Sequence, residues 1–296
     1  MLVAVLDVGS NTVRLLVAEV GRNGALEPVT TEKAYLGLGA EIARTGALAA
    51  DSIAAAANVG RRFAERARAQ GCERAEVVVT APGRQGAGAA TLVAALRGAT
   101  RLPVRVLTAD EEGRLAFDGA VARASGLPVS VGMVDVGGGS TEIVVGNRRN
   151  GARWVGSADL GSLRLTRLLL HGDPPSKREL AAARAAVRRA LSPLSPPRPE
   201  AALAVGGSAR ALAKLAGRTF DADSAEEAIA RLARRRSAKV ARAAGIDERR
   251  AETLLGGALL LAESSRALGR PLTLARGGLR EGAALALARE GAAAAA

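Results

Sequence analysis

The stretch VDVGGGSTEIVVG, residues 134–146, decides the fold. It runs from an apolar segment into Asp135, then through three glycines and a Ser–Thr pair to Glu142 and a second apolar segment. A glycine run weakens a strand, so it predicts a tight hairpin turn whose backbone approaches a ligand closely. A related stretch, LDVGSNTVRLLV, occupies residues 6–17, and its Asp7 lies 128 residues before Asp135 (135 − 7 = 128).

The two hairpins each begin a similar series of predicted elements. A third strand is expected near 26–38 in the first copy and near 154–160 in the second, and strands then alternate with helices. The second copy carries extra helices, including a long one predicted over 247–268. We therefore predict two duplicated α/β lobes, residues 1–124 and 125–296, with a ligand-binding cleft between them.

The composition excludes several kinds of site. The chain has one cysteine, Cys72, and one histidine, His171, which rules out an internal disulfide and a multi-histidine metal centre and disfavours a Ser–His–Asp triad. His171 precedes Gly172-Asp173-Pro174-Pro175 and is expected on a surface turn. A cytoplasmic location is expected, because cysteine is scarce and neither a signal peptide nor an apolar run of membrane-spanning length is evident.

The charge is strongly positive. Lys and Arg number 42 against 29 Asp and Glu, which gives a formal net charge of +13. Such a field attracts polyanions, although arginines on solvated helix faces account for much of it in an Ala/Arg-rich chain. Aromatic residues, which stack on bases, make up 2% of the chain, so nucleic-acid binding is not expected. No Gly-x-x-x-x-Gly-Lys-Ser/Thr motif is present, which disfavours a P-loop ATPase.

Three glycine turns predict phosphate sites built from backbone amides and short polar side chains. One such turn is commonly an ordinary hairpin or helix start, but three in this order favour anion binding. The predicted phosphate-binding residues are Gly9, Ser10, Asn11, Thr12, Gly137, Gly138, Gly139, Ser140, Thr141, Gly206, Gly207 and Ser208.

Carboxylates beside these turns predict a cation. Asp135 and Glu142 lie seven residues apart across the second turn, so both can point into the cleft, and two hard oxygen donors suit Mg²⁺. Asp7 could contribute through a bound water. Asp135 could instead stabilise the turn itself.

The pair Glu111-Glu112 follows a helix start. Thr108-Ala109-Asp110-Glu111 fits a capping box and predicts a helix over about 109–124. This box accounts for Glu111 and does not account for Glu112. The alternative is that Glu112 only interacts with the helix dipole.

Taken together, these motifs resemble those of the exopolyphosphatase / guanosine pentaphosphate phosphohydrolase (Ppx/GppA) family, in its short two-domain form. That family belongs to the actin–hexokinase–Hsp70 ATPase-type superfamily, so the resemblance implies ribonuclease H-like lobes. The matching stretches are residues 7–12, 80–84, 111–115, 135–142, 206–210 and 278–282.

The resemblance implies a role for each matched residue. Glu112 would be the general base, Asp135, Glu142 and Asp7 would serve the metal, and Arg84 would contact substrate phosphates with its planar guanidinium. Mg²⁺ is the expected cation, with Mn²⁺ as the alternative and a monovalent cation as a further option. The family's loop after Thr80 usually carries an acidic residue and an asparagine, and residues 81–88 lack both.

The expected activity is release of terminal orthophosphate from inorganic polyphosphate. Short chains are favoured because longer family members carry an additional helical domain that this chain is not expected to have. The alternatives are a guanosine pentaphosphate 5′-phosphohydrolase and a non-catalytic sensor that binds guanosine tetraphosphate, guanosine pentaphosphate or polyphosphate. A sugar kinase on the same fold is disfavoured, since no adenosine-site or sugar-site motif is evident. The resemblance also suggests a homodimer.

Overall fold

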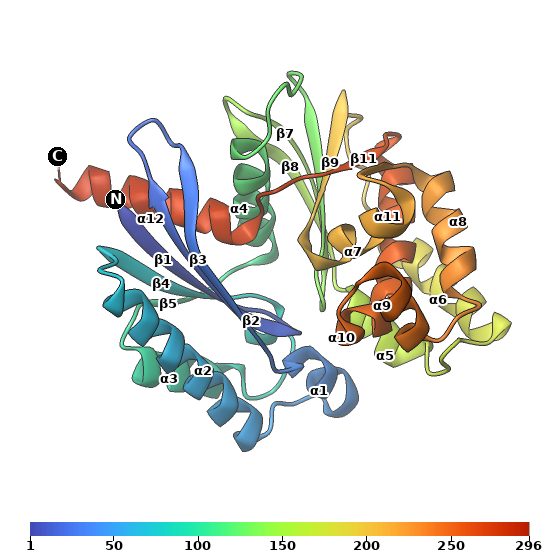
Figure 1. Ribbon diagram of the computed structural model, residues 1–296, viewed down its shortest axis with the longest axis horizontal. Coiled ribbons are helices and arrows are strands. Elements are labelled where there is room, and N and C mark those ends of the chain that lie inside the picture. The colour runs from blue at the N-terminus through green and yellow to red at the C-terminus, as the bar shows by residue number, and fades with distance from the viewer. Residues whose placement is uncertain (296) are drawn as a thin grey trace. The chain divides into compact units, whose positions relative to one another are not determined.

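The computed structural model describes residues 1–295 and divides into two compact units (Figure 1). Unit 1 comprises Met1–Arg123 together with the C-terminal segment from Gly277. Unit 2 comprises Ala124–Arg276.

Unit 1 is built on a five-stranded sheet in the order β3-β2-β1-β4-β5. β1, β2 and β3 form an antiparallel meander, and β4 and β5 run parallel to β1. The strands are β1 (Leu2–Val8), β2 (Thr12–Val20), β3 (Leu26–Tyr35), β4 (Arg74–Val79) and β5 (Val104–Val106). The helices are α1 (Leu38–Thr45), α2 (Ala50–Ala69), α3 (Ala89–Thr100), α4 (Ala109–Ala122) and α12 (Leu279–Ala295), with a 3₁₀ turn, η1 (Ala81–Gly83).

Both faces of this sheet are buried, which explains why β1 is apolar apart from Asp7. Successive strand residues point to opposite faces. Ala4, Leu6 and Val8 pack in the core that includes α2 and α3, whereas Val3 and Val5 pack in the core that includes α12. Figure 1 shows α2 and α3 on one side of the sheet and α12 on the other.

Unit 2 repeats the arrangement with a six-stranded sheet in the order β8-β7-β6-β9-β11-β10. The strands are β6 (Val131–Val136), β7 (Thr141–Asn147), β8 (Gly151–Ala158), β9 (Ala201–Val205), β10 (Thr219–Phe220) and β11 (Leu272–Leu274). The helices are α5 (Ser162–Leu169), α6 (Lys177–Leu191), α7 (Gly206–Ala216), α8 (Ala222–Leu232), α9 (Ser237–Ala244), α10 (Glu248–Glu252) and α11 (Leu254–Leu268). α11 is buried along most of its length and forms the centre of the helical core.

The predicted duplication is confirmed. In each unit an antiparallel meander of three strands continues into two strands parallel to the first, which is the ribonuclease H-like order. β10 is an addition of unit 2, antiparallel to β11 at the edge of the sheet.

Two expectations need correction. The predicted second lobe, 125–296, included the C-terminal helix, but α12 packs on α4 and on β1 of unit 1, where Ala283, Ala284 and Leu285 complete the second core. The single helix predicted over 247–268 was wrong, because α10 ends at Glu252 and α11 starts at Leu254.

Candidate active site

The predicted site residues of unit 1 gather where its parallel strands end. Asp7 lies near the end of β1, Arg84 follows β4 through η1, and α4 begins shortly after β5. The carboxyl ends of parallel strands meet at one edge of a sheet, which is the usual ligand-binding edge in open α/β folds.

The first turn of α4 confirms the predicted capping box, which uses Glu111. Thr108 Oγ1 accepts a bond from Glu111 N at 3.2 Å, and Glu111 Oε2 accepts one from Thr108 N at 2.8 Å, which completes a capping box. These bonds to Thr108 lower the pKa of Glu111. Glu112 takes no part in the cap and is buried, with 9% of its surface exposed.

Arg84 contacts Glu112 directly. Its Nη2 donates to Glu112 Oε2 at 2.8 Å, and its Nη1 donates to the carbonyl oxygen of Leu107. The two charged side chains are 20% and 11% exposed, so this is a largely desolvated ion pair. Glu112, the predicted general base, is therefore hydrogen-bonded to Arg84, which is predicted to contact phosphate. This bond fixes the direction of the Glu112 carboxylate.

The first glycine turn is a four-residue loop closed by a bond from Gly9 N to Thr12 O at 3.0 Å. Asp7 and Arg14 are cross-strand partners beside this turn, so their side chains share one face of the sheet. Burial raises the pKa of Asp7, while Arg280 and Arg14 act in the opposite direction. Arg280 comes from the first turn of α12, so a cationic pair faces Asp7.

The second glycine turn has the same construction. Gly137 N donates to Ser140 O at 3.0 Å, and Asp135 and Glu142 occupy the cross-strand positions that Asp7 and Arg14 occupy in unit 1. Glu142 is 1% exposed, and its Oε1 accepts a bond from Ser157 Oγ at 3.0 Å. The two carboxylates therefore lie on one face of the sheet, as predicted.

The two turns differ in charge at one equivalent position. Unit 1 places Arg14 opposite its aspartate and so supplies a positive charge from the protein, whereas unit 2 places Glu142 there and concentrates negative charge. A pair of hard carboxylate donors fits Mg²⁺ or Mn²⁺, which take the remaining ligands from water and substrate phosphates. Among residues 1–295 no cluster of three or more acidic, histidine or cysteine side chains is arranged to hold a metal.

The third glycine turn packs against the second. Gly206 has φ +85°, and a Cβ there would lie 2.6 Å from Asp135 Oδ1, so glycine lets the carboxylate approach the start of α7. A Cβ on Gly207 would lie 2.6 Å from Arg250 Nη2, which places a guanidinium at the same turn. Asp135, this turn and Arg250 therefore form one local site within unit 2.

The side chains of two predicted phosphate-binding residues, Thr141 and Ser208, are fully buried. Ser208 is fully buried, and a Cβ on Gly257 of α11 would lie 2.8 Å from its Oγ, so Ser208 would offer a ligand its backbone amide. Thr141 Oγ1 donates to Leu160 O at 2.7 Å. The carbonyl oxygens of Gly137 and Gly138 accept bonds from the first residues of α5, which anchors the loop.

Three basic residues beside predicted site residues were not predicted: Arg14 and Arg280 in unit 1 and Arg250 in unit 2. Arg14 could have been found by counting across the first hairpin, since a four-residue turn at Gly9–Thr12 pairs it with Asp7. Arg280 lay in a matching motif without an assigned role, and its approach to Asp7 depends on the packing of α12 in unit 1. Arg250 gave no sequence signal beyond a basic helix.

The sequence is similar to a described protein family along most of its length. The family model described as the Ppx/GppA phosphatase family matches residues 16–290. The chain is 32% identical over 290 residues to Exopolyphosphatase 1 of Mycobacterium leprae, a match that covers 90% of this chain and 84% of the relative. It is 37% identical over 202 residues to Exopolyphosphatase 2 of Mycobacterium tuberculosis, where the match covers 64% of this chain and 62% of the relative's length.

Solved structures give the same result for the fold. The Aquifex aeolicus PPX-GPPA enzyme superimposes with a TM-score of 0.80 at 26% identity, covering 97% of this chain and 99% of that one. An exopolyphosphatase from Cytophaga hutchinsonii gives a TM-score of 0.85 at 20% identity, covering 95% and 96%, and at that identity it supports the fold alone. Because the family model spans most of the sequence and both lobes have the expected topology, the chain belongs to the Ppx/GppA phosphatase family.

Proposed function

We propose that this protein is an exopolyphosphatase that releases terminal orthophosphate from inorganic polyphosphate, with a preference for short chains. The observation that carries the proposal is the buried Glu112 carboxylate held by Arg84 at the ligand-binding edge of unit 1. The exopolyphosphatases among its relatives favour polyphosphate as the substrate. Guanosine pentaphosphate is the second candidate, because the family is named for both activities.

The glycine turns would bind the terminal phosphate. Backbone amides at residues 9–12, 137–141 and 206–208 supply donors, although Gly9 N and Gly137 N already close their own turns. Arg84 and Arg250 would add guanidinium forks suited to phosphate oxygens. Asp135 and Glu142 would hold a divalent cation, which when bound neutralises charge on the substrate phosphates.

Glu112 would act on water. Its carboxylate accepts a proton as the water oxygen attacks the terminal phosphorus, the bridging P–O bond breaks, and orthophosphate leaves with the shortened chain as the other product. Phosphoryl transfer relies mainly on positioning and charge stabilisation, so the orientation that Arg84 imposes on Glu112 would contribute directly. Arg84 could also exchange part of its contact with Glu112 for a substrate oxygen.

Substitution of Glu112 tests the proposal, with its neighbour as a matched control. Glu112→Gln should lower the rate of orthophosphate release by about 10² to 10⁴-fold, the usual contribution of a general base. Glu111→Gln keeps the capping box and should leave the rate unchanged. Full activity in the Glu112→Gln protein would refute the assigned role.

The assay should compare tripolyphosphate, long polyphosphate and guanosine pentaphosphate, each with Mg²⁺, with Mn²⁺ and after chelation. Preferential hydrolysis of guanosine pentaphosphate would move the assignment to the second candidate. Tight binding of these compounds without any release of orthophosphate would indicate a sensor.

No helix among residues 1–295 is both long and apolar enough to cross a membrane. We propose a cytoplasmic location because the chain has a single cysteine, Cys72, and that cysteine is free.

A further inference from the structure

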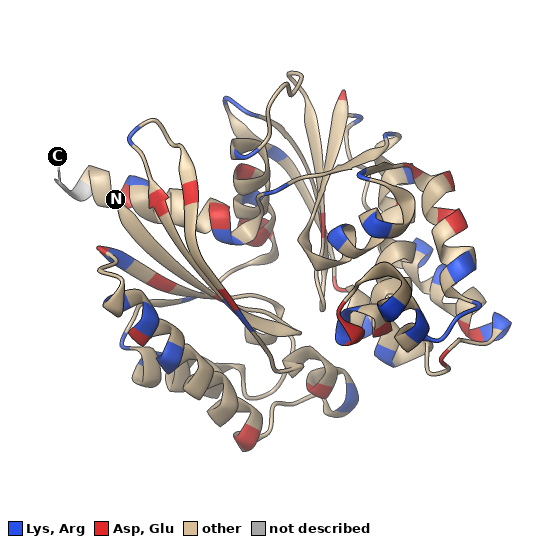
Figure 2. Ribbon diagram, viewed as in Figure 1, with Lys and Arg blue, Asp and Glu red and all other residues tan. Residues whose placement is uncertain are grey.

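The helical layer of unit 2 carries a concentrated positive charge. The segment RLARRRSAKVAR, residues 231–242, contains six cations and no carboxylate. All six of these side chains are exposed, and Lys214 on the neighbouring helix α7 is exposed as well. Figure 2 shows the corresponding bands of Lys and Arg on α7 and α9. We call the seven residues the basic surface: Lys214, Arg231, Arg234, Arg235, Arg236, Lys239 and Arg242.

A cavity of about 150 Å³ lies in this surface. Three of its lining residues are cations, Lys214, Arg231 and Arg235, and the others are apolar. A cavity whose polar groups are all cationic favours an anion.

Carboxylates do not pair with the described cations of the basic surface, although Asp173 accepts bonds from Ser237 N and Oγ within the same segment. Arg231 Nη2 donates to the carbonyl oxygen of Leu215 at 2.9 Å, and Lys214 Nζ donates to that of Gly245, so both contact helix ends. Within residues 1–295 none of the seven cations forms an ion pair with an acidic side chain.

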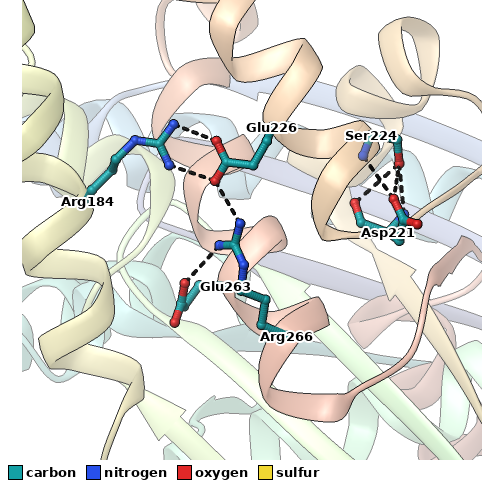
Figure 3. Close-up of polar contacts among 6 residues, drawn as sticks. All are labelled: Arg184, Asp221, Ser224, Glu226, Glu263 and Arg266. Atoms are coloured by element: carbon teal, nitrogen blue, oxygen red, sulfur yellow. Dashed lines mark hydrogen bonds and ion pairs between the residues drawn. The ribbon is translucent and has the colours of Figure 1, made fainter.

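Another arginine cluster in the same unit shows the contrast. Figure 3 shows Glu226 between Arg184 and Arg266, with Arg266 also contacting Glu263. The Arg184 bonds to Glu226 measure 2.6 and 2.5 Å, and the Arg266 bonds to Glu226 and Glu263 measure 2.9 and 3.1 Å. That cluster is neutralised internally and joins α6, α8 and α11, which indicates a structural role.

The basic surface is continuous with the third glycine turn through α7. Gly207, Arg210 and Lys214 are three and four residues apart, so they lie along one face of the helix. Lys214 lies seven residues after Gly207 on α7 (214 − 207 = 7), which corresponds to about 10 Å from the turn to the surface at 1.5 Å per residue. Arg250 adds a guanidinium beside Gly207 at the start of this path.

We propose that the basic surface binds the distal phosphates of an inorganic polyphosphate chain whose end occupies the Gly206–Ser208 turn. This inference rests on the proposed function and refines its preference for short chains, because chains long enough to reach from the turn to the cavity would bind more tightly than tripolyphosphate. Polyphosphate carries charge on every unit and has no bases to stack. The basic surface contains no aromatic residue, so it fits that polyanion better than a single-stranded nucleic acid.

The test compares two triple variants that remove the same charge. Lys214→Gln/Arg231→Gln/Arg235→Gln empties the cavity of cations, and Arg148→Gln/Arg149→Gln/Arg153→Gln removes three exposed arginines from the β7–β8 hairpin. Binding of long polyphosphate and of tripolyphosphate is measured by calorimetry, and KM and kcat are measured in parallel. The cavity variant should bind long polyphosphate about tenfold more weakly, from three exposed charge contacts, with tripolyphosphate binding and kcat unchanged.

Equal loss in both triple variants, or no loss in the cavity variant, would overturn the inference. Tighter binding of a single-stranded oligonucleotide of matched charge than of polyphosphate at this surface would overturn the choice of ligand. Arg235→Glu is a second variant, chosen because the Arg235 side chain forms no hydrogen bond within residues 1–295. It should also weaken binding of long polyphosphate. The binding measurement does not need hydrolysis, so it separates this inference from the proposed function. If the wild-type protein releases no orthophosphate but the cavity variant still binds long polyphosphate more weakly, the proposed function fails and the basic surface remains a polyphosphate-binding surface.

Discussion

Replacing Gly282 by alanine perturbs the place where α4 and α12 cross in unit 1. A Cβ on Gly282 would lie 1.8 Å from Leu115 O and 3.1 Å from Gly119 N. On the facing helix, a Cβ on Gly119 would lie 2.0 Å from Gly278 O. These neighbours are backbone atoms, so no side-chain rotation can relieve the contact.

The distances set the size of the effect. Ordinary contact begins at 3.4 Å, so the helices must separate by about 1.6 Å (3.4 − 1.8) to accept the methyl group. Overpacking of this kind costs about 1–3 kcal/mol, and a rigid backbone neighbour points to the upper end. Alanine returns about 0.5–1 kcal/mol through its better helix propensity. We expect a net loss of about 2 kcal/mol in the free energy of unfolding.

Thermal and urea unfolding followed by circular dichroism would measure this loss. Gly98 on α3 is the matched control, because a Cβ there would have no atom within 4 Å, and Gly98→Ala should stabilise the protein by about 0.5–1 kcal/mol. Orthophosphate release should also fall in Gly282→Ala, since α4 carries Glu112. A Gly282→Ala protein as stable as the wild type, or as the Gly98→Ala protein, would refute the close crossing.

Three further substitutions test electrostatics. Asp7→Asn should raise the melting temperature at neutral pH, because burial raises the pKa of Asp7 and its charged form destabilises the folded protein. This cost grows as pH rises through the pKa that Asp7 has in the unfolded chain, so the variant and the wild type should melt alike in acid. Glu179→Ala should lower the melting temperature at neutral pH, because hydrogen bonds from Ser176 at the start of α6 lower the Glu179 pKa to about 2. The difference in melting temperature between the two proteins should disappear as pH falls from 4.5 towards 2. Glu226→Ala should cost about 1–2 kcal/mol in urea unfolding at low salt and less at high salt, because Arg184 and Arg266 lose their shared acceptor. A pH-independent difference for Asp7 or Glu179, or a salt-independent one for Glu226, would contradict these assignments.

Local sequence determined the hairpins and their turns. An apolar segment that ends in Asp and a glycine run can pair with a following apolar segment in few ways, so the four-residue loops and the pairing of Asp135 with Glu142 follow from the pattern. The capping box at Thr108 was equally local, because a helix start satisfies its own amides. These features also account for most of the predicted site residues.

Packing between distant segments decided the rest. The Arg84–Glu112 ion pair joins residues 28 positions apart. Arg280 of α12 faces Asp7 because the chain returns from unit 2 to unit 1 at Gly277 and α12 packs on the first sheet. No local pattern determines such contacts, since a helix with an apolar face can pack on any sheet that has an uncovered apolar face. The sequence alone thus determined where the chemical groups occur along the chain, and the tertiary structure decided which of them face one another, because contact energies between elements depend on shape and burial rather than on neighbours in sequence.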